Sequence, residues 1–241
     1  MSTTLCFDFG NTRMKCAVFT DGAFRQELVL ENDSDVTIAA LLEAFHPDRS
    51  ILSSVIDHNP GMEALLQSAT RFHKLDHRSK VPITTPVGKP DSIGADRLAL
   101  TAAAVTLFPG KNNLVIGLGS AITYNYVNKY REFIGGGISP GMEMRFKSLH
   151  TFTARLPLVK ADWNFPLAGY DTRTNILSGV ILGMAKEIDG IVEAYEEKYD
   201  NINVLISGGD AGYFTRHLKK KIFADPHLIY KGLYAISELN S

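Results

Sequence analysis

Residues 8–15 run DFGNTRMK between two apolar stretches, and this segment is the strongest indication of the fold. Residues 5–9 and 14–20 flank this segment and predict two strands joined by a tight turn. Gly10 and Asn11 suit such a turn because both residue types can adopt a positive φ. Residues 24–30 alternate apolar and polar side chains, so a three-stranded meander is expected over residues 5–30.

Helices and further strands are predicted after this meander. Ser34 is a suitable N-cap for a helix. The inward-facing positions of that helix would be Val36, Ile38, Ala39, Leu41, Leu42 and Phe45. The other elements predicted before residue 109 are a buried strand over 51–56 and helices over 62–70 and 98–108.

The pattern restarts after the turn PGKNN at residues 109–113, where strong breakers meet polar residues. The elements predicted beyond it are strands over 114–116, 122–127, 132–134 and 203–207, helices after Pro140, from Thr172 and over 210–218, and a final short strand and helix. A glycine-rich turn follows the first strand of each half, at Gly10 and at Gly119. The expected fold class is therefore α/β, with two related domains at residues 1–110 and 111–241.

The overall composition excludes several classes of protein. The 241 residues are 45% hydrophobic with a net charge of −1, which is typical of a globular protein and not of one bound to nucleic acid through phosphates. No apolar run approaches the ~20 residues that span a bilayer, and the opening residues lack the features of a signal peptide. Two cysteines are too few for a disulfide framework. We expect a cytoplasmic protein without nucleic-acid or membrane partners.

Residues 8–15 also carry chemical groups that suit a phosphate. Gly10 would let backbone N–H groups approach an anion, Thr12 adds a hydroxyl donor, and Lys15 adds a positive charge. Asp8 is repelled by phosphate, so its useful role would be to hold Mg²⁺, directly or through water. An ordinary Asn-containing hairpin with a solvated aspartate is an alternative that this segment alone leaves open.

The segment GADR at residues 94–97 precedes a predicted helix. Asp96 is either a plain N-cap or a base near a substrate hydroxyl. In the second case Arg97 would bind a carboxylate or a phosphate. The segment by itself favours the N-cap interpretation.

Three glycine-rich segments follow in the second half. GLGSAIT at 117–123 resembles the first turn, with Ser120 in the place of Thr12. Residues 135–137 are three glycines in a strand context, which is costly unless a backbone or a ligand comes close. SGGD at 207–210 lies between a strand and a helix, where a nucleotide could lie against a helix N-terminus. Each segment alone is a weak signal.

Taken in order, these segments resemble the type III pantothenate kinases, the family also named after the Bvg accessory factor. The family motifs D-x-G-N-T-x-x-K, S-S-V and G-x-D-R match residues 8–15, 53–55 and 94–97. Four further motifs match as well: G-G-x-I-x-P-G at 135–141, T-A-x-L-P at 153–157, G-x-x-T at 169–172 and S-G-G at 207–209. The resemblance covers nearly the whole chain.

The resemblance implies two ribonuclease-H-like domains of the sugar kinase and actin superfamily. It also implies transfer of the γ-phosphoryl group of ATP to the terminal hydroxyl of pantothenate, the first step of coenzyme A biosynthesis. Family members are homodimers that use Mg²⁺ and a monovalent cation, K⁺ or NH₄⁺. By this resemblance, Asp96 is the catalytic residue and Asp8 holds the metal ion.

The other site residues are also carried over from the family by motif. Pantothenate would be bordered by Asn11, Val55, Gly94, Arg97 and, from the other subunit, Thr172. The nucleotide would contact Asp8, Gly10, Asn11, Thr12, Lys15, Gly119, Ser120, Gly208 and Gly209.

The sequence departs from the family pattern at several positions. Gly117 and Asn125 replace the first and last aspartates of the second phosphate motif, D-x-G-T-A-x-T-x-D, which removes carboxylates that would hold the monovalent cation. Val87 replaces a tyrosine that usually precedes G-x-D-R. Two alternatives to an active pantothenate kinase therefore remain. One is a ligand-binding or regulatory dimer without turnover, and the other is a kinase of the same fold for another small alcohol or sugar.

Overall fold

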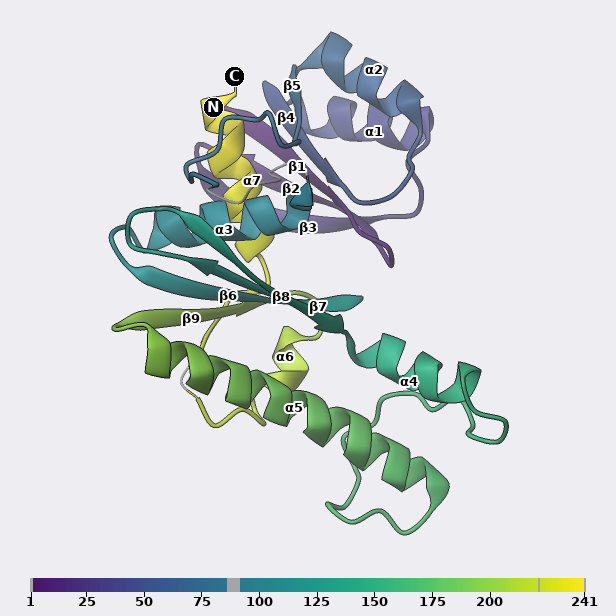
Figure 1. Ribbon diagram of the computed structural model, residues 1–241. Coiled ribbons are helices and arrows are strands. Elements are labelled where there is room, and N and C mark those ends of the chain that lie inside the picture. The colour runs from purple at the N-terminus through teal and green to yellow at the C-terminus, as the bar shows by residue number, and fades with distance from the viewer. Residues whose placement is uncertain (1, 86–91, 221, 241) are drawn as a thin grey trace. The chain divides into compact units, whose positions relative to one another are not determined.

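The computed structural model describes residues 2–85, 92–220 and 222–240, and the chain divides into two compact units. Unit 1 contains Met1–Gly110, Val127–Ile134 and His227–Ser241, and unit 2 contains Lys111–Tyr126 and Gly135–Pro226. Two five-stranded sheets form the framework (Figure 1). Because three separate segments build unit 1, residues far apart in the sequence share its core.

The first sheet lies in unit 1 and has the strand order β3-β2-β1-β4-β5. Its strands are β1 (Thr3–Phe9), β2 (Met14–Thr20), β3 (Ala23–Leu30), β4 (Arg49–Ser54) and β5 (Arg71–Lys74). The first three strands form the predicted antiparallel meander, whereas β4 and β5 run parallel to β1. Parallel neighbours end at the same edge of a sheet, so the residues that follow β1 and β4 lie close together.

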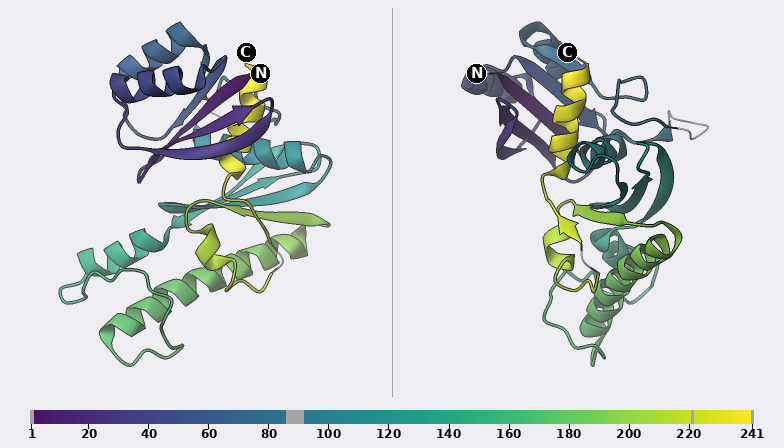
Figure 2. Two further views of the ribbon diagram at one scale, coloured as in Figure 1. Left: turned by 180° about the vertical axis from the view of Figure 1, so that it is seen from behind. Right: turned by 90° about the vertical axis from the view of Figure 1, so that its left-hand side faces the viewer.

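Helices cover both faces of this sheet. The helices of unit 1 are α1 (Asp35–Phe45), α2 (Pro60–Ala69), α3 (Ala95–Leu107) and α7 (Leu228–Leu239). α1 and α2 pack on the face to which Leu5, Phe7 and Phe9 point. α3 and α7 pack together on the other face, as the views in Figure 1 and Figure 2 show. Successive side chains of a strand point to opposite faces, so Asp8 faces α3 and α7.

The second sheet has the strand order β10-β9-β6-β7-β8. Its strands are β6 (Asn112–Leu118), β7 (Ala121–Val127), β8 (Phe133–Pro140), β9 (Ile202–Ser207) and β10 (Phe223–Ala224), and the helices of unit 2 are α4 (Met142–Thr151), α5 (Thr172–Lys198) and α6 (Ala211–Phe214). The long helix α5 lies along one face of the sheet and buries one apolar stripe against it (Figure 1). Because β9 pairs in parallel with β6 as β4 does with β1, the predicted recurrence is confirmed.

Three expectations for individual elements are wrong. Val36 and Ala39 of α1 are exposed, because this helix buries a narrow stripe with Ile38 at its centre. The helix predicted over 210–218 ends at Phe214, and turns follow it. The sequence predicts no strand at β5, because an edge strand of four residues carries too little periodicity to be recognised.

The two cysteines lie on neighbouring strands of the first sheet. Cys6 on β1 and Cys16 on β2 are both buried and free of disulfide bonds. Burial raises the pKa of both thiols. Since the thiolate is the reactive form, both residues are structural parts of the core.

Candidate active site

Asp8 lies at the end of β1, on the sheet face that α3 and α7 cover. Its Cα pairs with Lys15 on β2 and with Ser53 on β4. The pKa of the Asp8 carboxyl is raised to about 7, first by burial and next by the charge of Asp96, against the lowering effect of Lys15. Two carboxyl groups therefore lie within electrostatic reach of each other in a poorly solvated place.

The turn between β1 and β2 differs from the predicted tight turn. Neither Gly10 nor Asn11 adopts a positive φ. The Gly10 N–H instead donates to the carbonyl of Arg13 at 3.1 Å and closes a four-residue loop. Asn11 and Thr12 are exposed at the tip of this loop. The Gly10 N–H is thus used within the loop, whose tip exposes Asn11 and Thr12.

Asp96 lies in the first turn of α3 and is not its N-cap. The N-cap is Gly94, which makes no side-chain capping bond. A Cβ at Gly94 would lie 2.5 Å from Oδ1 of Asp96, so the glycine leaves room for the carboxylate. Burial raises the pKa of Asp96, although a backbone hydrogen bond and the charge of Arg97 oppose this rise. The N-cap interpretation of Asp96 is therefore wrong.

Arg97 follows Asp96 and is held by an aromatic ring. Its guanidinium carbon lies 5.4 Å from the ring centre of Phe133, the first residue of β8, which also belongs to unit 1. Such a cation–π contact is worth about 0.5–2 kcal/mol and fixes the direction of the side chain. Sequence reasoning missed Phe133, because a single aromatic residue in a strand gives no sign of a distant partner.

Residues at the end of β4 lie beside the end of β1, which carries Asp8. The Val55 N–H donates to the carbonyl of Phe9 at 3.0 Å, and the Val55 side chain is 44% exposed. The buried hydroxyl of Ser53, the strand partner of Asp8, makes no hydrogen bond to any residue that the structure describes. Leaving a buried hydroxyl unpaired costs about 1–3 kcal/mol. This cost is typical of a place where a ligand or a water molecule completes the bonding.

Lys15 is held on the same face by a residue that the sequence does not single out. Its Nζ lies 2.9 Å from Oε1 of Glu27 on β3. Oε2 of Glu27 lies 3.9 Å from Nδ1 of His227, and Tyr230 on α7 is near enough to this carboxylate for each group to shift the pKa of the other. Sequence reasoning missed Glu27, because one glutamate on an alternating strand is typical of a solvated face.

Two of the predicted glycine turns lie together in unit 2. Gly208 follows β9 with a φ of 103°, and a Cβ there would overlap the carbonyl of Leu118 at the end of β6. Gly119 begins the turn from β6 to β7, and the carbonyl of Ser120 accepts a hydrogen bond from the Gly141 N–H at 3.1 Å. The ends of two parallel strands thus bring the 119–120 and 208–209 turns side by side, at the edge where α/β sheets bind ligands.

The three glycines at 135–137 lie within β8 and have a structural explanation. Gly136 has a φ of 156°, and a Cβ there would overlap the backbone carbonyl of Tyr124 on β7. A close approach of two backbones therefore requires the middle glycine. Of the two interpretations that the sequence leaves open, the approach of a backbone explains this position without a ligand.

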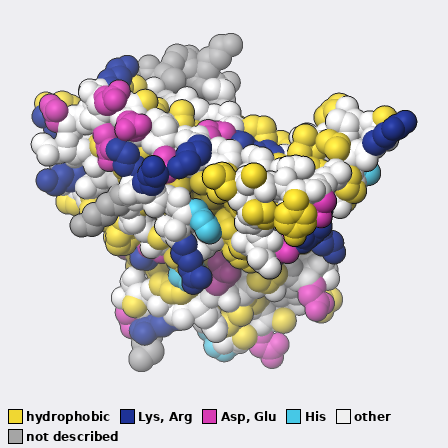
Figure 3. Space-filling view, turned by 90° about the horizontal axis from the view of Figure 1, so that it is seen from below, with side chains coloured by type: hydrophobic (Ala, Val, Ile, Leu, Met, Phe, Trp, Pro, Cys, Tyr) yellow, Lys and Arg dark blue, Asp and Glu magenta, His cyan; other side chains and the backbone are white. Residues whose placement is uncertain are grey.

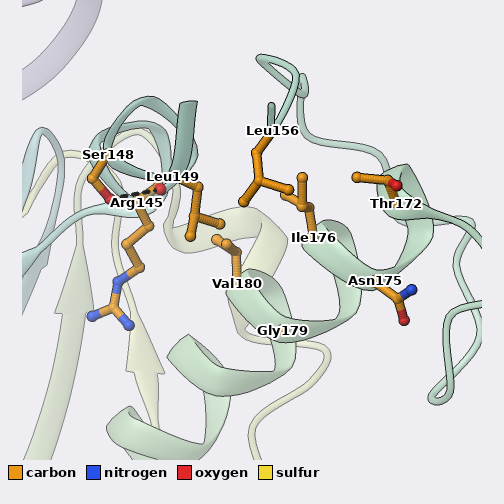
Figure 4. A pocket seen from close by; sticks show the side chains of 9 residues that line it. All are labelled: Arg145, Ser148, Leu149, Leu156, Thr172, Asn175, Ile176, Gly179 and Val180. Atoms are coloured by element: carbon orange, nitrogen blue, oxygen red, sulfur yellow. Dashed lines mark hydrogen bonds between the residues drawn. The ribbon is translucent and has the colours of Figure 1, made fainter. Parts of the chain in front are cut away.

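Thr172 begins α5 and lines a pocket of about 640 Å³ between α4 and α5. Figure 4 shows the apolar side chains that face one another in this pocket: Leu149, Leu156, Ile176 and Val180. The guanidinium of Arg145 points away from them and pairs with Glu187 at 2.5 Å (Figure 4). Thr172 thus lies at an apolar pocket of unit 2 and does not line the glycine turns.

A second pocket of unit 2, of about 510 Å³, adjoins Gly209. Trp163 forms part of its wall and stacks on two rings. The ring centres of Tyr213 and His217 lie 5.7 Å and 4.7 Å from that of Trp163, with nearly parallel planes. Arg216 lines the same pocket. The sequence assigns no role to these side chains, which the turn after α6 brings together.

The residues present fit a magnesium ion better than a carboxylate-bound monovalent cation. Mg²⁺ is usually held by one or two carboxylates together with water and substrate phosphates, and Asp8 offers a carboxylate oxygen beside a second acid. Gly117 offers no side chain. Asn125 is fully buried, and its amide nitrogen donates to the Val115 carbonyl at 3.2 Å and to the Thr123 hydroxyl at 3.1 Å. Positions 117 and 125 therefore do not form a carboxylate site for K⁺.

The part of the chain that the structure describes contains neither a metal-binding cluster of side chains nor a membrane-spanning helix. Residues 2–85, 92–220 and 222–240 contain no group of three or more His, Cys, Asp or Glu side chains placed to hold a metal ion. Within the same ranges, every helix is too short or too polar to cross a membrane. Val87, the predicted substitute for a family tyrosine, lies outside the described residues.

Comparison with known proteins identifies the family. A model of the type III pantothenate kinase family matches residues 4–194. A type III pantothenate kinase of Cytophaga hutchinsonii is 40% identical over 236 residues, which cover 98% of this chain and 99% of that protein. One from Bacteroides fragilis is 38% identical over 238 residues, which cover 98% of each. These relatives confirm the predicted family and the predicted class of enzyme, a pantothenate kinase.

Solved structures confirm the fold class. A Campylobacter jejuni structure, described as a Baf family transcriptional activator, has a TM-score of 0.61 at 22% identity, with 98% of both chains covered. A glucokinase from an Antarctic psychrotroph has a TM-score of 0.54 at 10% identity, with both chains fully covered. At these identities the likeness concerns the fold alone, which this chain shares with that glucokinase. From the family model and these relatives together, the chain belongs to the type III pantothenate kinase family.

Proposed function

We propose that this kinase transfers the γ-phosphoryl group of ATP to the terminal hydroxyl of pantothenate, with Asp8 and Asp96 at the centre of its active site. The observation that carries this proposal is the pair of carboxyl groups at the end of β1 and the start of α3. Burial raises the pKa of both groups, and the charge of Asp96 adds to the rise for Asp8. Phosphoryl transfer needs positioned charges more than covalent chemistry, and this pair supplies them.

Asp96 would accept or orient the proton of the pantothenate hydroxyl. A base works best when its pKa lies near the working pH, and burial raises the pKa of Asp96 in that direction. Val55 and Arg97, beside Asp96, would border pantothenate together with Gly94 and Asn11. The exposed side chain of Val55 offers an apolar contact, and the ring of Phe133 steadies Arg97.

The proposed nucleotide contacts fall into two sets of residues, one in the loop after β1 and one in the glycine turns after β6 and β9. Thr12 and Lys15 would bind phosphate oxygens with Asn11, while Gly10 gives the loop its shape. The paired turns at 119–120 and 208–209 would contact the rest of the nucleotide through backbone groups. Asp8 would hold Mg²⁺, which when bound supplies positive charge to the β- and γ-phosphates.

The monovalent cation, K⁺ or NH₄⁺, would have to be held without carboxylates at positions 117 and 125. The expected consequence is a weak dependence on K⁺, because a cation site made of neutral oxygens loses the charge attraction. Replacing K⁺ by Na⁺ should then change the rate only slightly. Gly117→Asp should tighten the response to K⁺ if position 117 borders the site.

One experiment separates the three candidate functions. Pantothenate-dependent release of ADP is measured for the natural chain, Asp96→Asn and the exposed control Asp200→Asn, each with K⁺, NH₄⁺ and Na⁺. Asp96→Asn should lower kcat by about 10²–10⁴-fold, since it removes the base but keeps the shape. The control should retain full activity.

Other outcomes of this experiment would support the alternatives. If the natural chain and Asp96→Asn are equally inactive with every cation and phosphoryl donor, a ligand-binding dimer without turnover is the better description. Turnover that is faster with another small alcohol or sugar would point to the third candidate, a kinase for a different substrate.

The proposal includes a homodimer in which Thr172 reaches the partner's active site. Unit 2 exposes large apolar side chains near Thr172: Phe152 is 85% exposed, and Leu167 and Tyr170 are each 82% exposed. Figure 3 shows apolar side chains among charged ones on the face seen from below. These exposed apolar side chains support the proposal of an interface with a second copy of the chain.

Mixed dimers test this arrangement. Asp96→Asn and Thr172→Trp are each expected to lose activity as pure dimers. When the two chains are co-expressed, one of the two sites in each mixed dimer combines an intact Asp96 with the other chain's intact Thr172. About a quarter of the natural activity should therefore return. Activity that stays at the level of the pure variants would show that Thr172 does not act across the dimer.

A further inference from the structure

The ammonium group of Lys15 is paired with a carboxylate that is itself held in place. Lys15 Nζ lies 2.9 Å from Glu27 Oε1, and each side chain is only 22% exposed. His227 Nδ1 lies 3.9 Å from the second oxygen of Glu27, and Tyr230 is near enough to this carboxylate for each group to shift the pKa of the other. Residues from β2, β3 and the start of α7 therefore meet at this one carboxylate.

The Glu27 carboxylate is ionised where it lies. Burial by itself would raise its pKa, but hydrogen bonds from Lys15 and Tyr230 and the charge of Lys15 hold the pKa below its ordinary value. The rings around it are fixed as well. His227 stacks on Phe24 with ring centres 4.4 Å apart, and burial raises the pKa of Tyr230, so its hydroxyl remains a donor.

We infer that Glu27 is a positioning residue for ATP: braced by Tyr230, it orders the Lys15 side chain so that the ammonium stays directed at the phosphates. This inference rests on the proposed role of Lys15 in phosphate binding. The Cα of Lys15 is paired with that of Asp8, so the ordered ammonium lies beside the carboxyl proposed to hold the metal.

The chemistry of an ammonium group explains why such a brace is useful. A free lysine side chain loses rotamer freedom when it binds a phosphate, and a partner that orders it beforehand reduces that loss. An ammonium has three N–H donors. One donor is used by Glu27, and two remain for phosphate oxygens. A solvated surface ion pair would have no such effect, but this pair is partly buried and lies against residues of α7.

The test compares the kinetic constants of Glu27→Ala and Tyr230→Phe with those of the natural enzyme. Glu27→Ala should raise the KM for ATP about three- to tenfold and leave the KM for pantothenate within about twofold. Tyr230→Phe should shift the KM for ATP in the same direction by a smaller factor. Glu27→Gln, which keeps the shape and an acceptor oxygen, gives an intermediate value and replaces Glu27→Ala if that variant fails to fold.

Glu63→Ala is the matched control. Glu63 lies in the same unit, its side chain is also 22% exposed, and it pairs with Lys74 at 2.7 Å and with His58 at 2.6 Å. Its removal therefore breaks a similar lysine–glutamate–histidine cluster, but one that does not include Lys15. The KM for ATP should stay unchanged in this variant. An equal rise in both variants would attribute the effect to general loosening and would overturn the inference.

Lys15→Met separates this inference from the proposed function. If Glu27 acts through Lys15, Glu27→Ala should have no further effect on the KM for ATP in the Lys15→Met background. A higher KM for ATP in Lys15→Met, with no change in Glu27→Ala, would overturn the inference and leave the proposed function intact.

A lower KM for ATP in Glu27→Ala would mean that Glu27 competes with the phosphates for Lys15, and this result would also overturn the inference. No change in Lys15→Met would overturn the proposed role of Lys15 itself.

Discussion

At the scale of single residues, the burial of the Asp8 carboxyl lowers the free energy of unfolding of the protein at neutral pH. Its carboxyl lies in a poorly solvated place next to a second acid, and its pKa is raised to about 7. In an unfolded chain the pKa of an aspartate is about 4. Between these two values the folded state binds more protons than the unfolded state, so folding loses free energy as the pH rises through this window. A cation bound at Asp8 would relieve the cost.

We therefore predict that Asp8→Asn gains stability relative to the natural chain as the pH rises. The gain between pH 4 and pH 8, without metal, should be about 2–4 kcal/mol, because the amide cannot ionise. The free energy of unfolding from urea titrations at several pH values measures it. Kinase activity should be lost in the same variant.

Glu63→Gln should change the stability of the protein with pH in the opposite direction to Asp8→Asn. Although burial opposes it, hydrogen bonds from Lys74 and His58 lower the pKa of Glu63 below its ordinary value. The stability that Glu63 contributes is thus present above its unfolded pKa and lost as the pH falls through its folded pKa. Glu63→Gln should be destabilised at pH 8 and not at acidic pH. A stability difference for Asp8→Asn that does not vary with pH would contradict the account of Asp8.

At the scale of elements, the packing of α3 against α7 fixes the backbone positions of two residues of the candidate site. α3 carries the buried alanines Ala99, Ala102, Ala103 and Ala104. Small side chains let two helix backbones approach, and a Cβ at Gly232 of α7 would overlap the carbonyl of Ala99. The same two helices carry Asp96 and Tyr230. Close packing here therefore fixes both Asp96, the proposed base, and Tyr230, the residue proposed to brace Glu27.

Gly232→Ala should destabilise the protein by about 1–3 kcal/mol, because the added methyl group forces the helices apart. Gly183→Ala in α5 is the control, since nothing lies within 4 Å of a Cβ at that position. There the same substitution should stabilise by up to about 1 kcal/mol, as expected for alanine in an exposed helix. Denaturant midpoints measure both changes, and equal effects would show that helix propensity alone is being measured.

At the scale of the whole molecule, the chain returns to unit 1 after building unit 2. α7 follows unit 2 in sequence but packs on α3, β1 and β4. Tyr234 of α7 also stacks on Phe19 of β2, with ring centres 4.8 Å apart. The core of unit 1 is therefore complete only when residues beyond 226 are present. The domain division at residues 110 and 111 stays a prediction.

A chain truncated after residue 226 should lose the cooperative stability of unit 1. Without α7, one face of the sheet and the buried side of α3 become exposed to water, and burial of such apolar surface is the main source of stability. Amide hydrogen exchange measures the effect. Amides of β1, β2 and α3 should lose most of their protection, whereas those of α5 keep it. Unchanged protection in β1 would show that unit 1 folds without its last helix.

The site was predicted unevenly. The places of Asp8, Asp96 and the glycine turns at 119 and 208, at strand ends or a helix start, could be predicted because local sequence shows each motif; their roles stay predictions. The turn at Gly10 and Asn11 was predicted with the wrong backbone, because a motif fixes residue types and not φ. Glu27 and Phe133 were missed, since their partners lie on other strands and helices.

The sequence by itself determined the family, the α/β class and the repeated strand order, because these depend on local motifs and on the spacing of apolar residues. Only the tertiary structure decided that α7 rejoins unit 1 and that Lys15 is paired with Glu27 under Tyr230. The stacking of Tyr234 on Phe19 joins residues more than two hundred positions apart, and Lys15 and Glu27, 12 positions apart, lie on neighbouring strands. They follow from packing and charge in three dimensions, and no local pattern in the chain encodes them.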